Sequence, residues 1–263
     1  MATTTTLGRL FFAFALIASG VQQLIRADFV RLVPKLPAWI PWPGCWACVM
    51  GVLLSVAGGA IAAKKGTRPA ATLLGAMLLL LFGLLYVPQI LANPAVGFIW
   101  TNPCKVLALL AGAIVLLGAS TDGTAGGFPA RIPPAGGMLP FAPWFLGVFL
   151  LICGVQHFVY AGFVDTLVPA WIPPGPRFWT CFTGGALIAG GAGLFLPKTT
   201  RLAATLSGMM IFLWVILLHI PRAAADWHNA GETSAIFEAL ALSGVAFLVA
   251  GSVRAGNARV ERN

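Results

Sequence analysis

The sequence predicts an all-α integral membrane protein with eight transmembrane helices, built as two parallel four-helix repeats. Only 9% of its 263 residues are charged and 59% are hydrophobic, whereas soluble domains contain about 25% charged residues. Residues 69–104 and 132–164 contain no Asp, Glu, Lys or Arg, and each stretch can hold a spanning helix of about 20 apolar residues. The apolar runs are continuous rather than alternating, so they indicate helices and not the strands of a barrel.

The apolar runs and the breaks between them define the expected elements in order. The eight expected spans are 7–25, 45–63, 70–88, 103–119, 141–161, 178–196, 202–220 and 235–251. They divide into a first repeat at 1–119 and a second repeat at 141–263, which ends in a short cytoplasmic tail. The residues between them, 120–140, are rich in Gly and Pro and are predicted to form a linker.

The two halves align with each other at an offset of about 133 residues. The segment LPAWIP at Leu36–Pro41 matches VPAWIP at Val168–Pro173. Further matching pairs, first half then second half, are Gly20 and Gly154, Trp46 and Trp179, Cys48 and Cys181, Arg68 and Arg201, and Pro88 and Pro221. Each half has an even number of expected spans, so both halves enter the membrane in the same direction. The repeat is therefore predicted to be parallel, unlike the inverted repeats of many ion-coupled transporters.

The distribution of Lys and Arg indicates the orientation. With the N-terminus inside, ten of the sixteen Lys and Arg residues lie on predicted inner segments and six on outer ones, in the sense of the positive-inside rule. Both termini are therefore predicted to be cytoplasmic, in a bacterial inner (plasma) membrane. The net charge of +9 is scattered among apolar spans and forms no basic face, so the expected partner is the lipid bilayer and not nucleic acid.

Several motifs of the second half resemble those of the DoxX-like membrane proteins. They are Gly154–Phe158 (GVQHF), Leu167–Pro173 (LVPAWIP) and His219–Pro221 (HIP). The first half matches more loosely, with Gln23 at the position of His157 and Tyr86 at that of His219. The resemblance implies a four-helix unit, here present twice. It also implies a redox-linked membrane subunit, because members of that family are associated with quinone-reducing and thiol-stress complexes.

Polar residues gather at the predicted outer ends of the second half, where ionisable groups are costly and often functional. The candidate cofactor-binding residues are Gln156, His157, Trp171, His219, Arg222 and Glu238. Two imidazoles on neighbouring spans can ligate haem or hydrogen-bond a quinone carbonyl, so quinone and haem are the candidate cofactors. The alternative is that both histidines only hydrogen-bond loop carbonyls. No zinc-spaced Cys and His cluster is present, so no metal site is predicted.

Glu238 has a second predicted role. Its repeat counterpart is Lys105, at the same depth of the fourth span. If the fourth and eighth spans face each other, the two side chains form a buried ion pair.

Cys45 and Cys48 form a C-x-x-C motif at the predicted outer mouth of the second span. This spacing supports disulfide exchange, which makes these two thiols the only candidate catalytic residues. A structural disulfide and simple apolar packing are the alternatives. The second half lacks the motif, since Phe178 stands in the place of Cys45.

The leading functional hypothesis is a non-catalytic or accessory multi-pass membrane subunit of a redox complex, working with partner membrane or redox subunits. It contributes a quinone or cofactor site on the outer side. Three alternatives stay open: a binding or transport protein for a small hydrophobic molecule, a membrane thiol-disulfide oxidoreductase, and a purely structural subunit. No P-loop, nucleophile elbow or dinucleotide fingerprint occurs, so soluble-type catalysis is not expected.

Overall fold

The computed structural model describes residues 2–30, 32, 37, 40–95, 97–119 and 137–260. Trp39 of the first AWIP segment and residues 120–136 of the predicted linker lie outside the described residues. All regular secondary structure of the described part is helical. In the first half the helices are α1 (Ala2–Arg26), α2 (Pro43–Ala63), α3 (Thr67–Leu81), η1 (Phe82–Tyr86), α4 (Val87–Ala92), η2 (Gly97–Trp100) and α5 (Thr101–Ala119). In the second half they are η4 (Leu139–Phe141), α6 (Ala142–Val159), α7 (Ala161–Leu167), α8 (Pro176–Leu194), α9 (Thr200–Trp214), η5 (Val215–His219), α10 (Ile220–Ala225) and α11 (Ala230–Val260).

Seven helices of the described residues are long and apolar enough to cross a membrane, so the chain is an integral membrane protein. They correspond to seven of the eight predicted spans. The remaining one, predicted at 178–196, is the 19-residue helix α8, which is not among the seven. Its five glycines, together with Thr180 and Thr183, dilute its apolar character, because glycine has no side chain to transfer into lipid.

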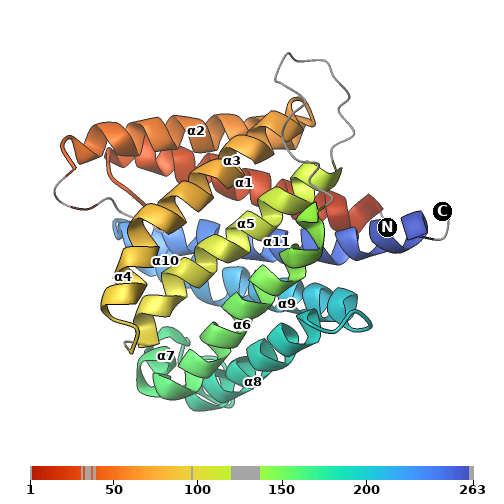
Figure 1. The fold of residues 1–263 in the computed structure, drawn as a ribbon. Helices are drawn as coiled ribbons and strands as arrows, with labels where there is room; N and C mark the ends of the chain where they lie inside the picture. Colours follow the sequence, from red (N-terminus) through yellow and green to blue (C-terminus); the bar gives the residue numbers. More distant parts are fainter. Residues whose placement is uncertain are drawn as a thin grey trace.

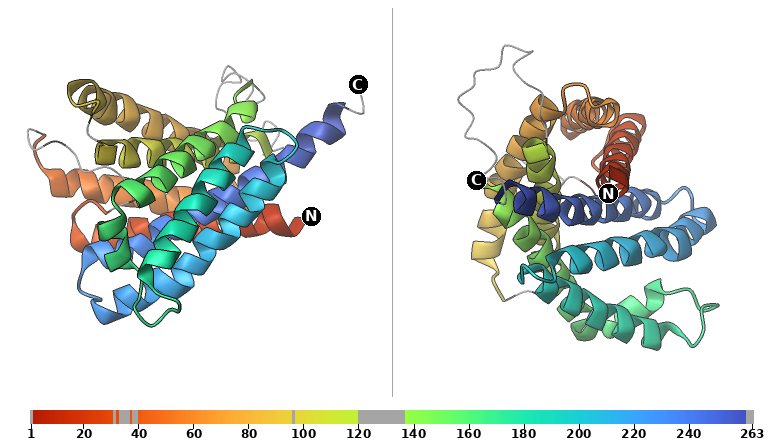
Figure 2. Two further views of the ribbon diagram at one scale, coloured as in Figure 1. Left: turned by 90° about the horizontal axis from the view of Figure 1, so that it is seen from below. Right: turned by 90° about the vertical axis from the view of Figure 1, so that its right-hand side faces the viewer.

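The long helices contact one another in a ring, and α5 and α11 lie in its middle (Figures 1 and 2). In the first half α1 packs on α2, α2 on α3, and α3 on α5; in the second half α6 packs on α8, α8 on α9, and α9 on α11. Two further contacts join the halves, because α1 packs on α11 and α6 packs on α5. Helices α5 and α11 also touch each other. The start of α1 and the end of α11 lie at the same end of the bundle (Figure 2).

The first two helices of each half approach closely at paired glycines. A Cβ atom added to Gly20 of α1 would lie 2.5 Å from the carbonyl oxygen of Gly51 in α2. At the matching place a Cβ on Gly154 of α6 would lie 2.9 Å from the carbonyl oxygen of Gly184 in α8. Only glycine permits this backbone approach, which lipid-embedded helices use in place of hydrophobic association.

The third helix of each half contains one π-helical turn at the same position. Segments η1 and η5 precede Pro88 and Pro221, and their last bonds run from the amide of Val87 to Phe82 O and from the amide of Ile220 to Val215 O. A proline lacks the amide hydrogen for an i−4 bond, and its ring pushes against that carbonyl. The widened π turn accommodates both defects without breaking the helix.

Candidate functional site

Lys105 and Glu238 form the ion pair that the repeat predicted. Lys105 Nζ on α5 lies 3.2 Å from Glu238 Oε1 on α11, and the two side chains are 8% and 21% exposed. The prediction is confirmed. The contact joins the two central helices, so the two halves of the chain share one buried pair of opposite charges.

Two further polar side chains of the first half are buried: Tyr86, the last residue of η1, and Cys104, next to Lys105 on α5. The second carboxylate oxygen, Glu238 Oε2, is buried without a hydrogen-bond partner among the described residues. One oxygen of Glu238 thus faces Lys105, while the other is buried without a hydrogen bond.

His157 is held in one orientation by α6 and α9. Its Nδ1 lies 2.7 Å from the carbonyl oxygen of Cys153, and its ring stacks on Trp214 with 6.2 Å between centroids. A carbonyl oxygen only accepts, so neutral His157 carries its hydrogen on Nδ1 and leaves Nε2 as an acceptor. Trp214 is followed five residues later by His219, at the end of η5. His157 therefore packs on the stretch of helix that leads to the second predicted histidine.

The matching residues of the first half are more deeply buried. Gln23, at the place of His157, is fully buried and donates from Nε2 to Ala47 O at 3.0 Å. Tyr86, at the place of His219, is buried, whereas His157 and His219 are both half-buried. The second half alone carries accessible imidazoles at these two positions.

Gln156 serves a purpose that the sequence did not reveal. It donates from Nε2 to Gly97 O at 2.8 Å and accepts at Oε1 from Thr101 Oγ1 at 2.8 Å, so it ties α6 to α5. Gln22 makes the corresponding contacts between α1 and α11, with Ala230 O at 3.5 Å and with Ser234 Oγ at 3.1 Å. The Gln side chains therefore join the halves at two equivalent places. The recurring Gln at positions 22 and 156 was the only signal in the sequence.

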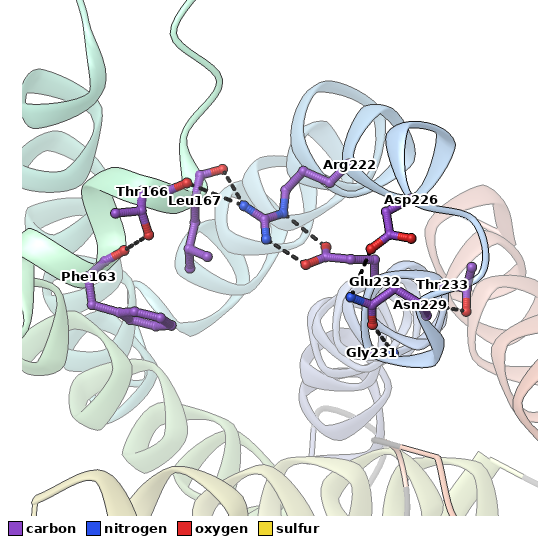
Figure 3. A network of polar contacts seen from close by, with 9 residues as sticks. All are labelled: Phe163, Thr166, Leu167, Arg222, Asp226, Asn229, Gly231, Glu232 and Thr233. Atoms are coloured by element: carbon purple, nitrogen blue, oxygen red, sulfur yellow. Dashed lines mark hydrogen bonds and ion pairs between the residues drawn. The ribbon is translucent and has the colours of Figure 1, made fainter.

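Arg222 belongs to a network at the start of α11 (Figure 3). Its guanidinium contacts both carboxylate oxygens of Glu232, at 2.9 and 2.5 Å, and donates to the carbonyl oxygens of Thr166 and Leu167. Arg222 thus links the end of α7 to α11. Its Nε, Nη1 and Nη2 are directed to protein groups, and its predicted role in cofactor binding stays a prediction.

The other predicted residues lie in the connection between α7 and α8 and at the start of α2. Trp171 is exposed in the connection between α7 and α8. Cys45 is exposed and Cys48 half-buried in the first turns of α2, and both thiols are free. They are accessible to a reaction partner and form no structural disulfide.

One internal void of the described part is apolar and has a volume of about 10 Å³; Phe12, Leu54 and Leu109 are among the residues that line it. A space of that size holds about one water molecule. No group of three or more His, Cys, Asp or Glu side chains that could hold a metal ion occurs among the described residues.

The comparisons with known proteins leave the function open. Residues 146–254 match a family described as a domain of unknown function, DUF8561. The matched part runs from α6 into α11, which makes the second half similar to that family, while no DoxX-like family matches. No curated protein and no solved structure matches the chain.

Proposed function

We propose that this protein is an accessory membrane subunit of a redox complex and binds a quinone-type head group beside His157. The observation that carries the proposal is the fixed tautomer of this residue: Cys153 O occupies Nδ1 and leaves Nε2 as an acceptor. A quinol hydroxyl is the donor that such a nitrogen accepts. On oxidation of the quinol, one proton would pass to His157 Nε2 and the second to solvent water, and both electrons would pass to a redox centre on a partner subunit.

The difference between the halves supports this assignment. Gln23 and Tyr86 fill the corresponding space of the first half with buried side chains, whereas the second half presents His157 and His219 half-buried. Trp214, stacked on His157, adds a flat aromatic surface. The resemblance of the GVQHF and HIP motifs to DoxX-like proteins points to the same class of complex. A head group would bind at the half-buried surface of His157, beside the ring of Trp214.

The proposed architecture is a duplicated four-helix unit with eight spans, in which α8 crosses the membrane in addition to the seven candidate spans. The start of α1 and the end of α11 lie at the same end of the bundle (Figure 2). Seven crossings would place the two termini on opposite sides of the membrane. Termini on the same side need an even number of crossings, so α8 must cross as well. At about 1.5 Å per residue its 19 residues reach roughly 28 Å, close to the thickness of the hydrocarbon core. Equivalent helix contacts, π turns and Gln contacts in both halves favour the duplication.

A thiol-exchange role is the second candidate. It is favoured by the free thiols of Cys45 and Cys48, which lie one turn apart at the start of α2. In that case substitution of either cysteine by serine abolishes exchange with a disulfide substrate, while His157→Gln leaves it unchanged.

Quinone binding can be tested by titrating the purified full chain with a short-chain quinone and following the quenching of tryptophan fluorescence. We expect saturable binding, with a Kd raised at least about fivefold in His157→Gln, since the loss of a good hydrogen bond costs roughly 1 kcal/mol or more. His228→Gln is the matched control, because His228 is exposed on the turn before α11. Absence of saturable binding, or equal Kd values for the two variants, would contradict the proposal. Copurification from native membranes tests the partner subunits.

A further inference from the structure

The two charged residues that pair between the central helices α5 and α11 occupy equivalent positions in the two halves. Lys105 and Glu238 are repeat counterparts, on α5 and α11, and these helices touch each other. Where two related units pack about a twofold axis, a residue near the axis meets its own counterpart. Two first halves would therefore bring one Lys105 against another, and two second halves would bring together two Glu238 carboxylates.

Other contacts between the halves would form about equally well between two identical halves and between a first half and a second half. Gln22 and Gln156 are the same residue type and share two equivalent partners, Ala230 and Ser234 of α11 against Gly97 of η2 and Thr101 of α5. Gln22 makes one further bond, to Thr233 Oγ1 at 2.7 Å. Apolar helix surfaces also discriminate poorly in lipid, because lipid tails are as apolar as the side chains they replace. A buried charge discriminates strongly, since like charges repel and an unpaired charge is poorly solvated.

We propose that the Lys105–Glu238 pair determines which half each half packs against, so that a first half associates only with a unit that carries a carboxylate at the position of Glu238. This inference rests on the proposed duplication and is independent of quinone binding. With its side chain 8% exposed, Lys105 cannot keep its ammonium group in water. The pair thus acts as a specificity element for the association of unlike halves within one chain.

The test compares four full-length proteins: wild type, Lys105→Glu, Glu238→Lys and the double reversal. The ratio of folded to unfolded protein is measured by unfolding in mixed detergent micelles. Each single reversal should lower this ratio on the order of a hundredfold, because two like charges then meet between α5 and α11. The double reversal should restore it to within about tenfold of wild type. Lys65→Glu, an exposed change after α2, should leave it unchanged. Additive damage in the double reversal would overturn the proposal.

Selectivity itself is measured on the neutral double variant Lys105→Met with Glu238→Gln. Removal of both charges leaves no unpaired charge, so this protein should fold. It should contain a larger share of dimers than wild type in light scattering, since like halves of two chains can then pair. An unchanged monomer fraction in this variant would show that the ion pair contributes stability without selecting the mate, and the inference would be wrong.

Discussion

Lys105 and Glu238 meet between α5 and α11 with 3.2 Å between Nζ and Oε1, at matching positions of the two halves. Each residue alone would be a buried charge in a membrane helix, and each is the neutralising partner of the other. The contact also fixes the register of the two most buried helices, because a shift of one turn would separate the charges. The ion pair therefore links the sequence repeat directly to the packing of the bundle.

The Gln contacts between the halves should contribute measurably to stability. Gln156→Leu removes two hydrogen bonds, one from α6 to Gly97 of η2 and one to Thr101 of α5, and hydrogen bonds between membrane helices contribute about 0.6 kcal/mol on average. We expect the free energy of unfolding to fall by about 1–2 kcal/mol, and by a similar amount for Gln22→Leu. Thr72→Val is the control, since half-buried Thr72 forms its side-chain hydrogen bond within its own helix, to Arg68 O. Unchanged unfolding curves for both Gln variants would show that these contacts are dispensable.

Two adjacent glycines of α8 should respond in opposite ways to alanine. A Cβ atom at Gly184 would lie 2.9 Å from the Cβ atom of His157, whereas one at Gly185 would meet nothing within 4 Å. Gly184→Ala should therefore destabilise the protein by about 1–3 kcal/mol through overpacking. Gly185→Ala should be neutral or stabilising by up to about 1 kcal/mol, because alanine favours helix. Thermal unfolding in detergent separates the two, and equal melting temperatures would contradict this packing.

The orientation can be read from the reactivity of one thiol. Cys45 is exposed at the start of α2, and Lys65 follows its opposite end. In a chain whose other cysteines are replaced by serine, a membrane-impermeant maleimide should label Cys45 in intact spheroplasts. In a cysteine-free chain, Lys65→Cys should be labelled only after permeabilisation. The reverse pattern would place both termini outside.

The π turns should matter for the site in the second half only. Pro221→Ala restores an amide that can bond to the carbonyl of Leu217, so η5 should relax to α-helix. Loss of the extra residue turns His219 by about 100° relative to the preceding helix. We expect weaker quinone binding by Pro221→Ala and unchanged binding by Pro88→Ala, both measured by fluorescence titration. Equal effects would separate η5 from the site.

Composition and periodicity were sufficient for the helices but not for their ends. Apolar runs and the breaks between them located the seven candidate spans, and the repeat located the contact between Lys105 and Glu238. The short helix α7 and the continuation of the third helices through α4 and α10 were missed, because hydropathy reports transfer into lipid and not where backbone hydrogen bonding stops. The role of Arg222 was also missed. A guanidinium looks the same in sequence whether it binds a ligand or, as here, Glu232 and the end of α7.

The contact between Gln22 and Ala230 has a consequence for the timing of synthesis. These residues are 208 positions apart, and ribosomes add about 5–20 residues each second. Helix α1 therefore spends roughly 10–40 s in the membrane before α11, its partner, emerges. During that interval the surface of α1 that will face α11, including Gly8 opposite Gly244, is open to lipid, insertion factors or another nascent chain. Helix α11, made well after α1, completes the environment of α1.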